Sequence, residues 1–442
     1  MRKVTSCLYC FIIVFCFCGI SVNANAQVNA KNGNLNVGYN DLVLEDAEDN
    51  EVFALNRTYN SIATKTGWFG LGWGSDLETI LVKKDDGYVV VFNGSAQSVK
   101  FIGDAKDGNI VTYVNRTRYV LQAMDGGAIL TNSENGDIYE FDEDGMLSLI
   151  IKSGTKTKLE WDDALLLADV GGIKVKLHFE EHDGERRLVR AELANGDARY
   201  TYKNGNLIQS KDTESNKFRY EYDEFDRLVR IRYEDGTTRK FEYQDGRRWI
   251  TKQEYRDNSF YVYDYHQDTE NPNKDYSTIV TRYDRNGAVH GIDTYWFIID
   301  ESDNGDDWLR EIRRSVNDVS NAKSSVMNAI YNECCGMPVV VHFDNININI
   351  EYKEKGRGWL ISTIKEIGSK NRMDFEYNKN YNPTRLIYNK DEVIGIINDD
   401  NGDVLVESDG EPEAIREIMK KFQSWYDALL MVSTCECMMV SR

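Results

Sequence analysis

Tyr220-Glu221-Tyr222-Asp223-Glu224-Phe225-Asp226-Arg227-Leu228 is the clearest copy of a motif that recurs along this chain. Two aromatic residues flank one other residue, an acidic or amide residue and a turn follow, and a basic and an aliphatic residue end the unit. Aromatic side chains two positions apart lie on one face of a β-strand. Residues 228–233 then alternate apolar and charged side chains, as a returning strand would. The motif therefore predicts a β-hairpin with one aromatic face.

The motif repeats at a nearly constant spacing. With the second aromatic as the marker, successive copies lie 20, 18, 23, 20, 21, 20 and 20 residues apart. The markers are Phe141, Trp161, Phe179, Tyr202, Tyr222, Tyr243, Tyr263 and Tyr283, with weaker copies at Tyr352 and Tyr377. Asp223 and Asp264 directly follow their markers. Because one hairpin is not stable alone whereas stacked hairpins share a core, the spacing predicts an all-β array of antiparallel hairpins.

Asx-Gly dipeptides separate the expected strands. They occur at 204–205, 235–236, 245–246 and 286–287. Such pairs favour two-residue hairpin turns because both turn positions must adopt positive φ. The 26 Tyr and 33 Gly residues also favour many short strands joined by tight turns.

The aromatic-x-aromatic-Asp units resemble the YD repeats, also called Rhs repeats. The segments Arg57-Thr58-Tyr59-Asn60-Ser61 and Gly67-Trp68-Phe69-Gly70-Leu71-Gly72-Trp73 look like the region that precedes the repeats in that family, so the resemblance covers roughly residues 30 to 400. It implies a long antiparallel ribbon that spirals into a shell, which in large members encloses a C-terminal toxin released at an Asp-Pro-containing motif. This chain has no Asp-Pro dipeptide and a short repeat region. We therefore expect a curved sheet or a partial shell.

The N-terminus predicts export. Arg2 and Lys3 precede an apolar run from Cys7 to Ile20, and Ala24-Asn25-Ala26 provides a small-residue cleavage site. This pattern predicts a signal peptide over residues 1–26. Lipidation at Cys18 is the alternative. The protein would be periplasmic, at the cell surface or secreted, and no later segment approaches the roughly 20 apolar residues of a spanning helix.

The mature chain is strongly acidic. Without Arg2 and Lys3, 51 basic residues face 73 acidic ones, which gives a net charge of −22. This charge disfavours nucleic acid and anionic membrane surfaces as partners. An unknown protein or a glycan is the expected partner.

The chain divides into five segments by pattern. Residues 27–135 are a β-rich N-terminal region, 136–300 carry the regular repeats, and 301–408 carry degenerate repeats with an insertion. Residues 308–325 also fit helical spacing, but the neighbouring pattern favours strands. In residues 409–442, apolar residues recur at three- and four-residue steps after Pro412, which predicts an amphipathic helix. We expect it to cap the array; docking to a membrane surface or a partner is the alternative.

The mature chain contains four cysteines, in two pairs. Cys334 and Cys335 could form a disulfide with Cys435 or Cys437 after export, or all four could stay as free thiols or small buried residues.

No catalytic motif is present, so we expect a non-enzymatic protein. His178 and His182 are four apart, which suits a metal only on a helix, and here they flank a predicted turn. The acidic segments 399–403 and 303–307 supply oxygen ligands suited to calcium, but neither completes a Ca²⁺ loop. We therefore expect no cofactor.

Exposed aromatic side chains are the remaining route to a binding function. Tyr and Trp on an open sheet face can bind sugar rings or a protein groove. The contributors considered are Trp68, Trp73, Trp249, Trp296 and Trp308, although repeat cores would also use such residues. The leading hypothesis is an exported scaffold or binding protein at the cell envelope. The alternatives are a component of an Rhs-type competition system, such as a toxin shell, and a glycan-cleaving enzyme.

Overall fold

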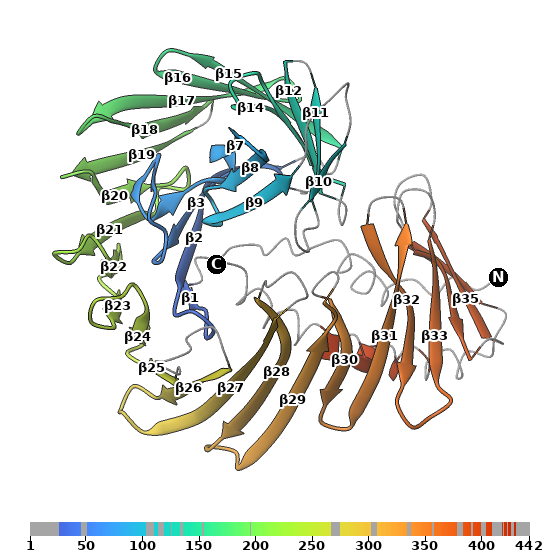
Figure 1. Ribbon diagram of the computed structural model, residues 1–442. Helices are drawn as coiled ribbons and strands as arrows, with labels where there is room; N and C mark the ends of the chain where they lie inside the picture. Colours follow the sequence, from blue (N-terminus) through green and yellow to red (C-terminus); the bar gives the residue numbers. More distant parts are fainter. Residues whose placement is uncertain are drawn as a thin grey trace. The chain divides into compact units, whose positions relative to one another are not determined.

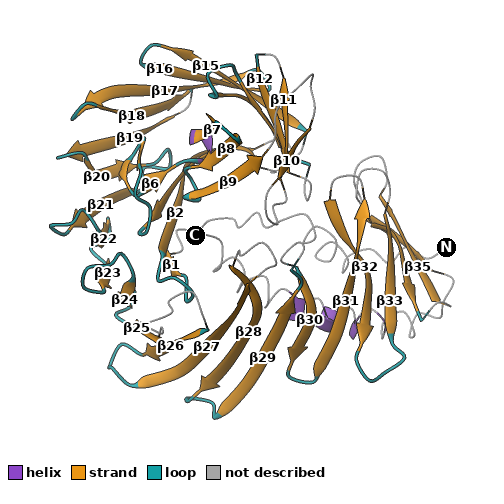
Figure 2. Ribbon diagram, viewed as in Figure 1, coloured by secondary structure: helices purple, strands orange, loops and turns teal. Residues whose placement is uncertain are grey.

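The protein is all-β, as the repeat motif predicts (Figure 2). The computed structural model describes residues 26–45, 51–102, 110–113, 119–124, 126–132, 136–152, 154–194, 196–266, 275–301, 307–333, 337–355, 358–377, 383–389, 392–398 and 404–408, with 418, 420–421, 423–425 and 428–429. The described chain forms two compact units. The N-terminal unit comprises Val22–Tyr265 and Thr278–Ile292, and the C-terminal unit comprises His266–Ser277 and Asp293–Cys437.

The N-terminal unit begins with a small separate sheet. Its strand order is β1-β2-β3-β6, and a two-stranded β4–β5 hairpin and the short 3₁₀ helix η2 accompany it. The bounds are β1 Ala26–Val28, β2 Leu35–Glu45, β3 Glu51–Asn60, β4 Thr66–Gly67, β5 Gly70–Leu71, β6 Trp73–Gly74 and η2 Asp76–Glu78. In Figure 1 these blue strands lie beside the green repeat strands of the same unit. We call residues 26–78 the anchor region.

The repeats of the N-terminal unit form a run of antiparallel strands in which neighbours in sequence pair with one another. An isolated bridge from Ile80 to Met146 also joins β7 to the β13–β14 hairpin. The bounds are β7 Thr79–Lys84, β8 Gly87–Phe92, β9 Gln97–Ile102, β10 Ile110–Tyr113, β11 Tyr119–Met124, β12 Gly127–Asn132, β13 Ile138–Phe141, β14 Leu147–Lys152, β15 Thr155–Asp162, β16 Leu165–Val170, β17 Ile173–His182, β18 Glu185–Leu193, β19 Gly196–Lys203, β20 Asn206–Lys211, β21 Lys217–Tyr222, β22 Leu228–Tyr233, β23 Thr238–Tyr243, β24 Ile250–Glu254 and β25 Phe260–His266.

The first aromatic of each motif supplies the core of the array. Tyr200, Tyr220 and Phe241 are buried. The residue between the aromatics lies on the solvent face and pairs across the hairpin: Glu221 binds Arg230 at 2.7 Å. This alternation is the reason that an aromatic-charged-aromatic pattern forms strands.

The turns differ in type. At Asn204-Gly205 both φ angles are positive, 50° and 74°, as expected for an Asx-Gly hairpin turn. At 235–236, 245–246 and 286–287 only the glycine has positive φ, so the expectation of a two-residue turn is wrong there. The backbone instead forms wider turns, such as the one in which the Tyr233 N–H donates to the Thr237 carbonyl.

The C-terminal unit continues the same antiparallel pattern. The ambiguous segment 308–325 falls mostly in β28 and is strand, as favoured. β26 Tyr276–Tyr283 and β27 Val289–Glu301 each have residues in both units. The further bounds are β28 Asp307–Asp318, β29 Lys323–Tyr331, β30 Pro338–Phe343, β31 Ile346–Lys355, β32 Gly358–Glu366, β33 Arg372–Tyr377, β34 Pro383–Tyr388, β35 Glu392–Asn398 and β36 Val404–Ser408.

A short helix follows the strands of the C-terminal unit. Its described residues bury Ile418, Trp425, Ala428 and Leu429, and Lys421 forms an ion pair with Glu366 at the end of β32, at 2.9 Å. The apolar face predicted from the sequence is therefore packed within the unit.

Candidate functional site

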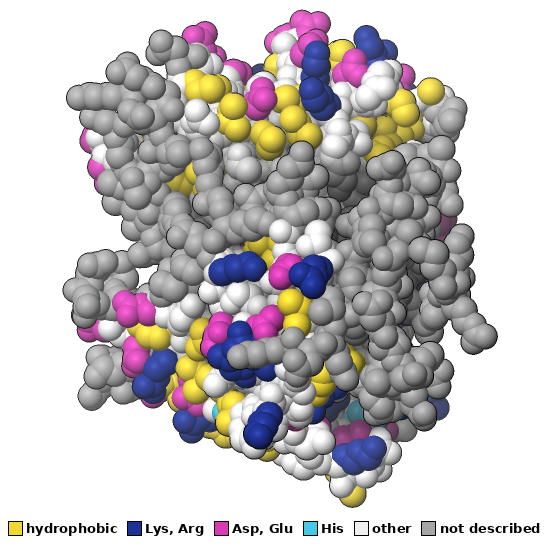
Figure 3. All heavy atoms as spheres, turned by 90° about the vertical axis from the view of Figure 1, so that its right-hand side faces the viewer, with side chains coloured by type: hydrophobic (Ala, Val, Ile, Leu, Met, Phe, Trp, Pro, Cys, Tyr) yellow, Lys and Arg dark blue, Asp and Glu magenta, His cyan; other side chains and the backbone are white. Residues whose placement is uncertain are grey.

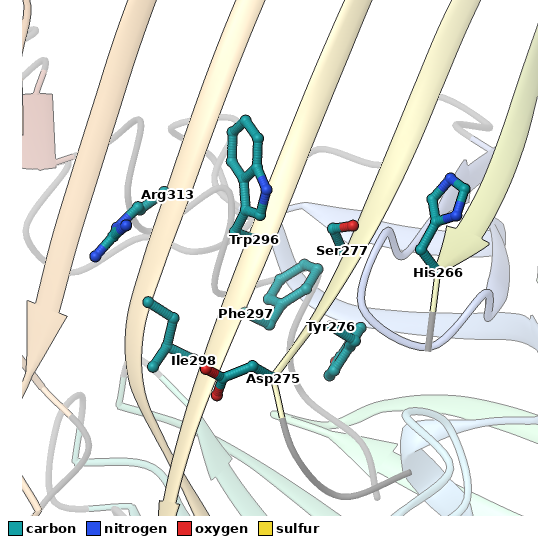
Figure 4. A pocket seen from close by; sticks show the side chains of 8 residues that line it. All are labelled: His266, Asp275, Tyr276, Ser277, Trp296, Phe297, Ile298 and Arg313. Atoms are coloured by element: carbon teal, nitrogen blue, oxygen red, sulfur yellow. The ribbon is translucent and has the colours of Figure 1, made fainter. Parts of the chain in front are cut away.

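The C-terminal unit contains a groove of ≈ 530 Å³ (Figure 4). It is lined by His266, Asp275, Tyr276, Ser277, Trp296, Phe297, Ile298 and Arg313. The groove lies on strands that the repeat pattern predicted, but its position could not be read from that pattern.

Neighbouring strands supply the side chains of the groove. His266 ends β25, Ser277 lies in β26, Trp296 in β27 and Arg313 in β28, and these strands are adjacent in the sheet. Figure 4 shows the four side chains following one another across the strands. Trp296 is 41% exposed, whereas its neighbours in sequence, Tyr295 and Phe297, are buried. Strand alternation therefore puts the indole on the solvent face.

Two polar contacts fix the edges of the groove. Asp275 Oδ1 accepts the backbone N–H of Ile299 at 3.0 Å. Arg313 Nε donates to Glu311 Oε1 at 2.6 Å, and this hydrogen bond and the charge of Glu311 raise the pKa of Arg313. Arg313 therefore keeps its charge near neutral pH. The groove combines an exposed aromatic ring with polar donors and acceptors, which is the chemistry of ligand binding.

The other tryptophans considered from the sequence serve the packing. Trp73 is buried, and Trp68 packs edge-on against Trp161 and Phe179 with ring centroids 5.9 and 5.1 Å away. The ring centroid of Trp249 lies 5.2 Å from that of Tyr265. Trp308 is half-buried in β28. Trp296 is the one of the five whose side chain is exposed.

The marker tyrosines join successive hairpins. Tyr222 pairs with Leu228 immediately after an irregularity in the strand register, and Tyr243 in the next hairpin donates its hydroxyl to the carbonyl of Leu228 at 2.9 Å. The same bond recurs in both units. Its other members are Tyr202 to Leu188, Tyr222 to Leu207, Tyr265 to Ile250, Tyr352 to Pro338 and Tyr377 to Ile361, at 2.6 to 2.9 Å. The markers thus have a structural role in the repeat.

One copy differs from the register read in the sequence. Tyr263 is buried like Tyr220, and Tyr265 makes the marker hydrogen bond. Asp264 accordingly lies within β25, whereas Asp223 caps a turn by accepting the N–H groups of Phe225 and Arg227. Three alternating tyrosines, 261, 263 and 265, made the register ambiguous.

The remaining markers lie in the strands without the tyrosine bond. Phe141 and Phe179 are buried next to register irregularities of their hairpins. Trp161 pairs with Leu166 in β15–β16. Tyr283 ends β26 and stacks on Phe260, with ring centroids 4.5 Å apart.

The anchor region is joined to the repeats through a buried ion pair. Arg57 in β3 and Asp41 in β2 are both fully buried, and two nitrogens of the guanidinium donate to the two carboxylate oxygens at 2.8 and 3.0 Å. Arg57 also donates to Ser210 of β20, and Tyr200 of β19 donates to Asp41 at 2.9 Å. Burial opposes the charge of Arg57, but the field and hydrogen bonds of Asp41 raise the pKa well above its usual value.

Aromatic rings enclose this ion pair. The Arg57 guanidinium lies 4.5 Å from the Tyr39 ring centroid and 4.7 Å from that of Trp73. Burial raises the pKa of Tyr220, which lies 5.3 Å from the same guanidinium, to about 12. The arginine is therefore stabilised by cation–π contacts as well as by its carboxylate.

The other residues of the two anchor motifs bind the repeat backbone. Tyr59 accepts the N–H of Leu228, Ser61 donates to the Arg248 carbonyl at 2.8 Å, and Trp68 accepts the N–H of Leu188. Trp73 donates to the hydroxyl of the marker Tyr222 at 2.9 Å. The motifs at 57–61 and 67–73 thus dock the anchor region onto the array.

Several expected features do not form a site or fall outside the described chain. His178 binds Glu192 and His182 lies near Glu180, so the two histidines do not converge on the hairpin. The cysteines at 334, 335, 435 and 437 lie outside the described residues, as do residues 1–25 and the acidic runs 303–306 and 399–403. Among the residues that are described, no cluster of three His, Cys, Asp or Glu could hold a metal, and no helix is long and apolar enough to cross a membrane.

Comparison with solved structures gives low overall similarity. The chain is 11% identical to TcdB2-TccC3-TEV over 86% of this chain and 22% of that one, with a TM-score of 0.34. The chain is 8% identical to TcdB2-TccC3-Cdc42 over 85% of this chain and 26% of that one, with a TM-score of 0.33. A porin-like protein from Bacteroides uniformis ATCC 8492 is 10% identical over 64% of this chain and 89% of that one, with a TM-score of 0.16. The chain thus spans about a quarter of the two TcdB2-TccC3 chains, and no curated protein matches it.

Two family models match the sequence. A domain of unknown function, DUF6531, matches residues 25–101, which contain the anchor region. The RHS repeat model matches residues 203–238, which contain the Tyr220 hairpin. With its aromatic hairpins joined marker to marker, the chain contains Rhs repeats, also called YD repeats.

Proposed function

We propose that this protein is an exported, non-enzymatic scaffold that presents a β-sheet surface to a partner at the cell envelope. One observation carries the proposal: the distinctive side chains of the sequence motifs are engaged in joining hairpins and in docking the anchor region. Arg57, Asp41 and the marker tyrosines are bound in this way. The groove at Trp296 is by contrast open to solvent and lies on a sheet face.

The solvent-exposed surface suits a soluble scaffold. Acidic and basic side chains alternate across hairpins, as in the pairs Glu242 with Lys252 and Glu254 with Lys240. On the face shown in Figure 3, acidic and basic side chains lie interspersed, with hydrophobic atoms between them. A mixed surface keeps the array soluble and leaves recognition to local features such as the groove.

Binding to the envelope tests the proposal. The mature chain, labelled at its N-terminus, is incubated with isolated cell envelopes of the producing organism, and saturable binding that unlabelled protein displaces is expected. Absence of displaceable binding would overturn the proposed role. A sheet protein of similar charge and size is the control for non-specific adsorption.

Export is tested by the mass of the mature chain. Cleavage after Ala26 gives a chain that begins at Gln27, whereas lipidation gives a lipidated Cys18 as the first residue. Intact-mass measurement of the native protein distinguishes the two. Detection of an uncleaved chain that remains in the cytoplasm would contradict export.

A second candidate function is a part in an Rhs-type competition system, which the RHS repeat match favours. Expression of residues 411–442 in a sensitive host tests an effector in that segment. Normal growth of the host would count against an effector, and growth arrest relieved by a neighbouring gene of the producer would favour this function over a scaffold.

A further inference from the structure

We propose that the groove around Trp296 binds a neutral, hexose-based glycan. This inference rests on the proposed function, because it names the ligand class for one part of the presented surface. Its starting point is the indole of Trp296, which is 41% exposed although tryptophan is among the most strongly buried side chains on average. The ring lies in a groove, so a ligand there can cover it from more than one side.

Aromatic core rings pack on the face of the sheet opposite the indole. On the buried face, Phe297 stacks on Tyr276 with ring centroids 4.9 Å apart, and these residues lie next to Trp296 in β27 and to Ser277 in β26. The two strands are neighbours within the sheet. Because core rings hold both strands, Trp296 is presented with little loss of conformational entropy on binding.

The groups around the indole match the chemistry of a sugar. A pyranose has an apolar face of C–H groups and a rim of hydroxyls, so an aromatic ring covers the face while polar side chains bind the rim. The Ser277 hydroxyl can donate and accept, the Asp275 carboxylate can accept beyond its bond from Ile299, and Arg313 has N–H groups beyond the one that binds Glu311. All three residues line the groove with Trp296.

Charge favours a neutral glycan over a polyanion. Arg313 is paired with Glu311, and the carboxylate of Asp275 lies in the same groove, so the local charge is not basic. The mature chain carries a net charge of −22, which repels uronate-rich or sulfated polysaccharides at long range.

Geometry favours a glycan over an extended peptide. A peptide that adds to a sheet needs an unpaired strand edge, whose N–H and C=O groups it binds. β26 and β27 are each paired on both sides in the sheet, so their face offers side chains and not backbone groups. A ligand that binds through ring stacking and side-chain hydrogen bonds fits this face.

The test uses the mature full-length chain and defined probes. Isothermal titration is performed with cellohexaose, maltohexaose and α-1,6-mannohexaose, with polygalacturonate as the anionic comparison. We expect at least one neutral hexasaccharide to bind and polygalacturonate not to bind. Trp296→Ala is expected to weaken that binding roughly tenfold or more, whereas Trp296→Phe, which keeps a stacking face, retains most of it. Ser277→Ala should weaken binding a few-fold.

A matched control separates the site from exposed aromatics in general. Phe225 is 60% exposed at the tip of the β21–β22 turn in the N-terminal unit. Phe225→Ala should leave glycan affinity unchanged. Circular dichroism of each variant confirms that the sheet is intact, and Ser277→Ala keeps the test decisive if Trp296→Ala folds poorly.

The outcomes distinguish this inference from the proposed function. If Trp296→Ala binds a neutral glycan as tightly as the natural chain, the site is wrong. If no neutral glycan binds, or if protease treatment of the envelopes abolishes binding, the glycan class is wrong while the scaffold role stands. If the chain does not bind envelopes at all, the scaffold role itself fails.

Discussion

The hydroxyl of Tyr243 donates to the carbonyl oxygen of Leu228, the residue that pairs with the preceding marker, Tyr222. Tyr222 in turn binds the carbonyl of Leu207, which pairs with Tyr202. Each of these markers is therefore hydrogen-bonded to the hairpin before it. In the six copies that make this bond, the acceptor lies 14 to 16 residues before the tyrosine, so the bond fixes how each hairpin packs on the one before it.

Tyr243→Phe should lower the free energy of unfolding by about 1 kcal/mol, because it removes the hydroxyl that donates to the Leu228 carbonyl. Urea denaturation measures the change. The same substitution at Tyr88, a half-buried strand residue whose hydroxyl has no hydrogen-bond partner among the described residues, is the control and should have a smaller effect. Equal losses in the two variants would mean that the marker bond contributes nothing specific.

Arg57→Leu should destabilise the N-terminal unit by about 3–5 kcal/mol, because it leaves the buried Asp41 carboxylate without its counter-charge. The double substitution Arg57→Leu with Asp41→Leu removes both charges, so its loss should be smaller than the sum of the two single losses. Urea unfolding of the four proteins gives the coupling energy. Additive losses would contradict a direct interaction between the two side chains.

The hairpin array was predictable from the sequence because its signal is local. Alternation and an aromatic every 20 residues depend only on neighbours along the chain, and they also favoured the strand at 308–325 over a helix. Turn geometry was less predictable: Asp235-Gly236 has the residues of a two-residue turn, but the chain forms a wider one. The predicted register was wrong at Tyr263, because three alternating tyrosines fit the motif in two ways.

The long-range contacts could not be predicted from one sequence. Asp41 and Tyr200 are 159 positions apart, and no periodicity links them. The groove likewise depends on four strands placing His266, Ser277, Trp296 and Arg313 in one row, which requires their register. The sequence named Trp296 as a contributor, but it could not separate this tryptophan from the buried Trp73.

Lys421→Met should loosen the C-terminal helix. The Lys421 ammonium binds Glu366 Oε2 at 2.9 Å, and the side chains of Asn371 and Ser369 also donate to this carboxylate. Burial opposes the charge of Glu366, but these donors prevail and lower its pKa to about 2. Hydrogen exchange of the described helix residues 418, 420, 421, 423–425, 428 and 429 should become faster in the variant. Lys420→Met, at an exposed neighbouring position, is the control.

The same pair gives a pH dependence. A carboxylate with a lowered folded-state pKa stabilises the fold above its unfolded value, near 4.3, and this stabilisation is lost as the pH falls toward 2. Protection of the helix should therefore decrease over that range in the natural chain and less so in Glu366→Gln. Identical acid profiles for the two proteins would show that another group controls the docking of the helix.

Glu78 should make the N-terminal unit less stable as the pH rises. Its carboxylate is buried in the anchor region, where it accepts the N–H groups of Trp68 at 2.6 Å and Ser75 at 2.9 Å. Burial outweighs these two hydrogen bonds and the field of Arg187, and raises the pKa of Glu78 to about 8. Between pH 4.3 and 8 the folded state therefore holds a proton that the unfolded state has released. The free energy of unfolding should fall over this range, by on the order of 1 kcal/mol per pH unit at most.

Glu78→Gln isolates this effect because glutamine does not titrate. The variant is expected to be less stable at pH 5.5, since its amide NH₂ replaces one acceptor oxygen and faces the N–H of either Trp68 or Ser75. Other titrating groups are common to both proteins, so the difference between their urea-unfolding free energies at pH 5.5, 7 and 8.5 reports Glu78 alone. That difference should shrink as the pH rises, because only the natural chain loses stability by ionising Glu78. A constant difference would show that the carboxylate stays ionised in the fold and that the two N–H donors outweigh its burial.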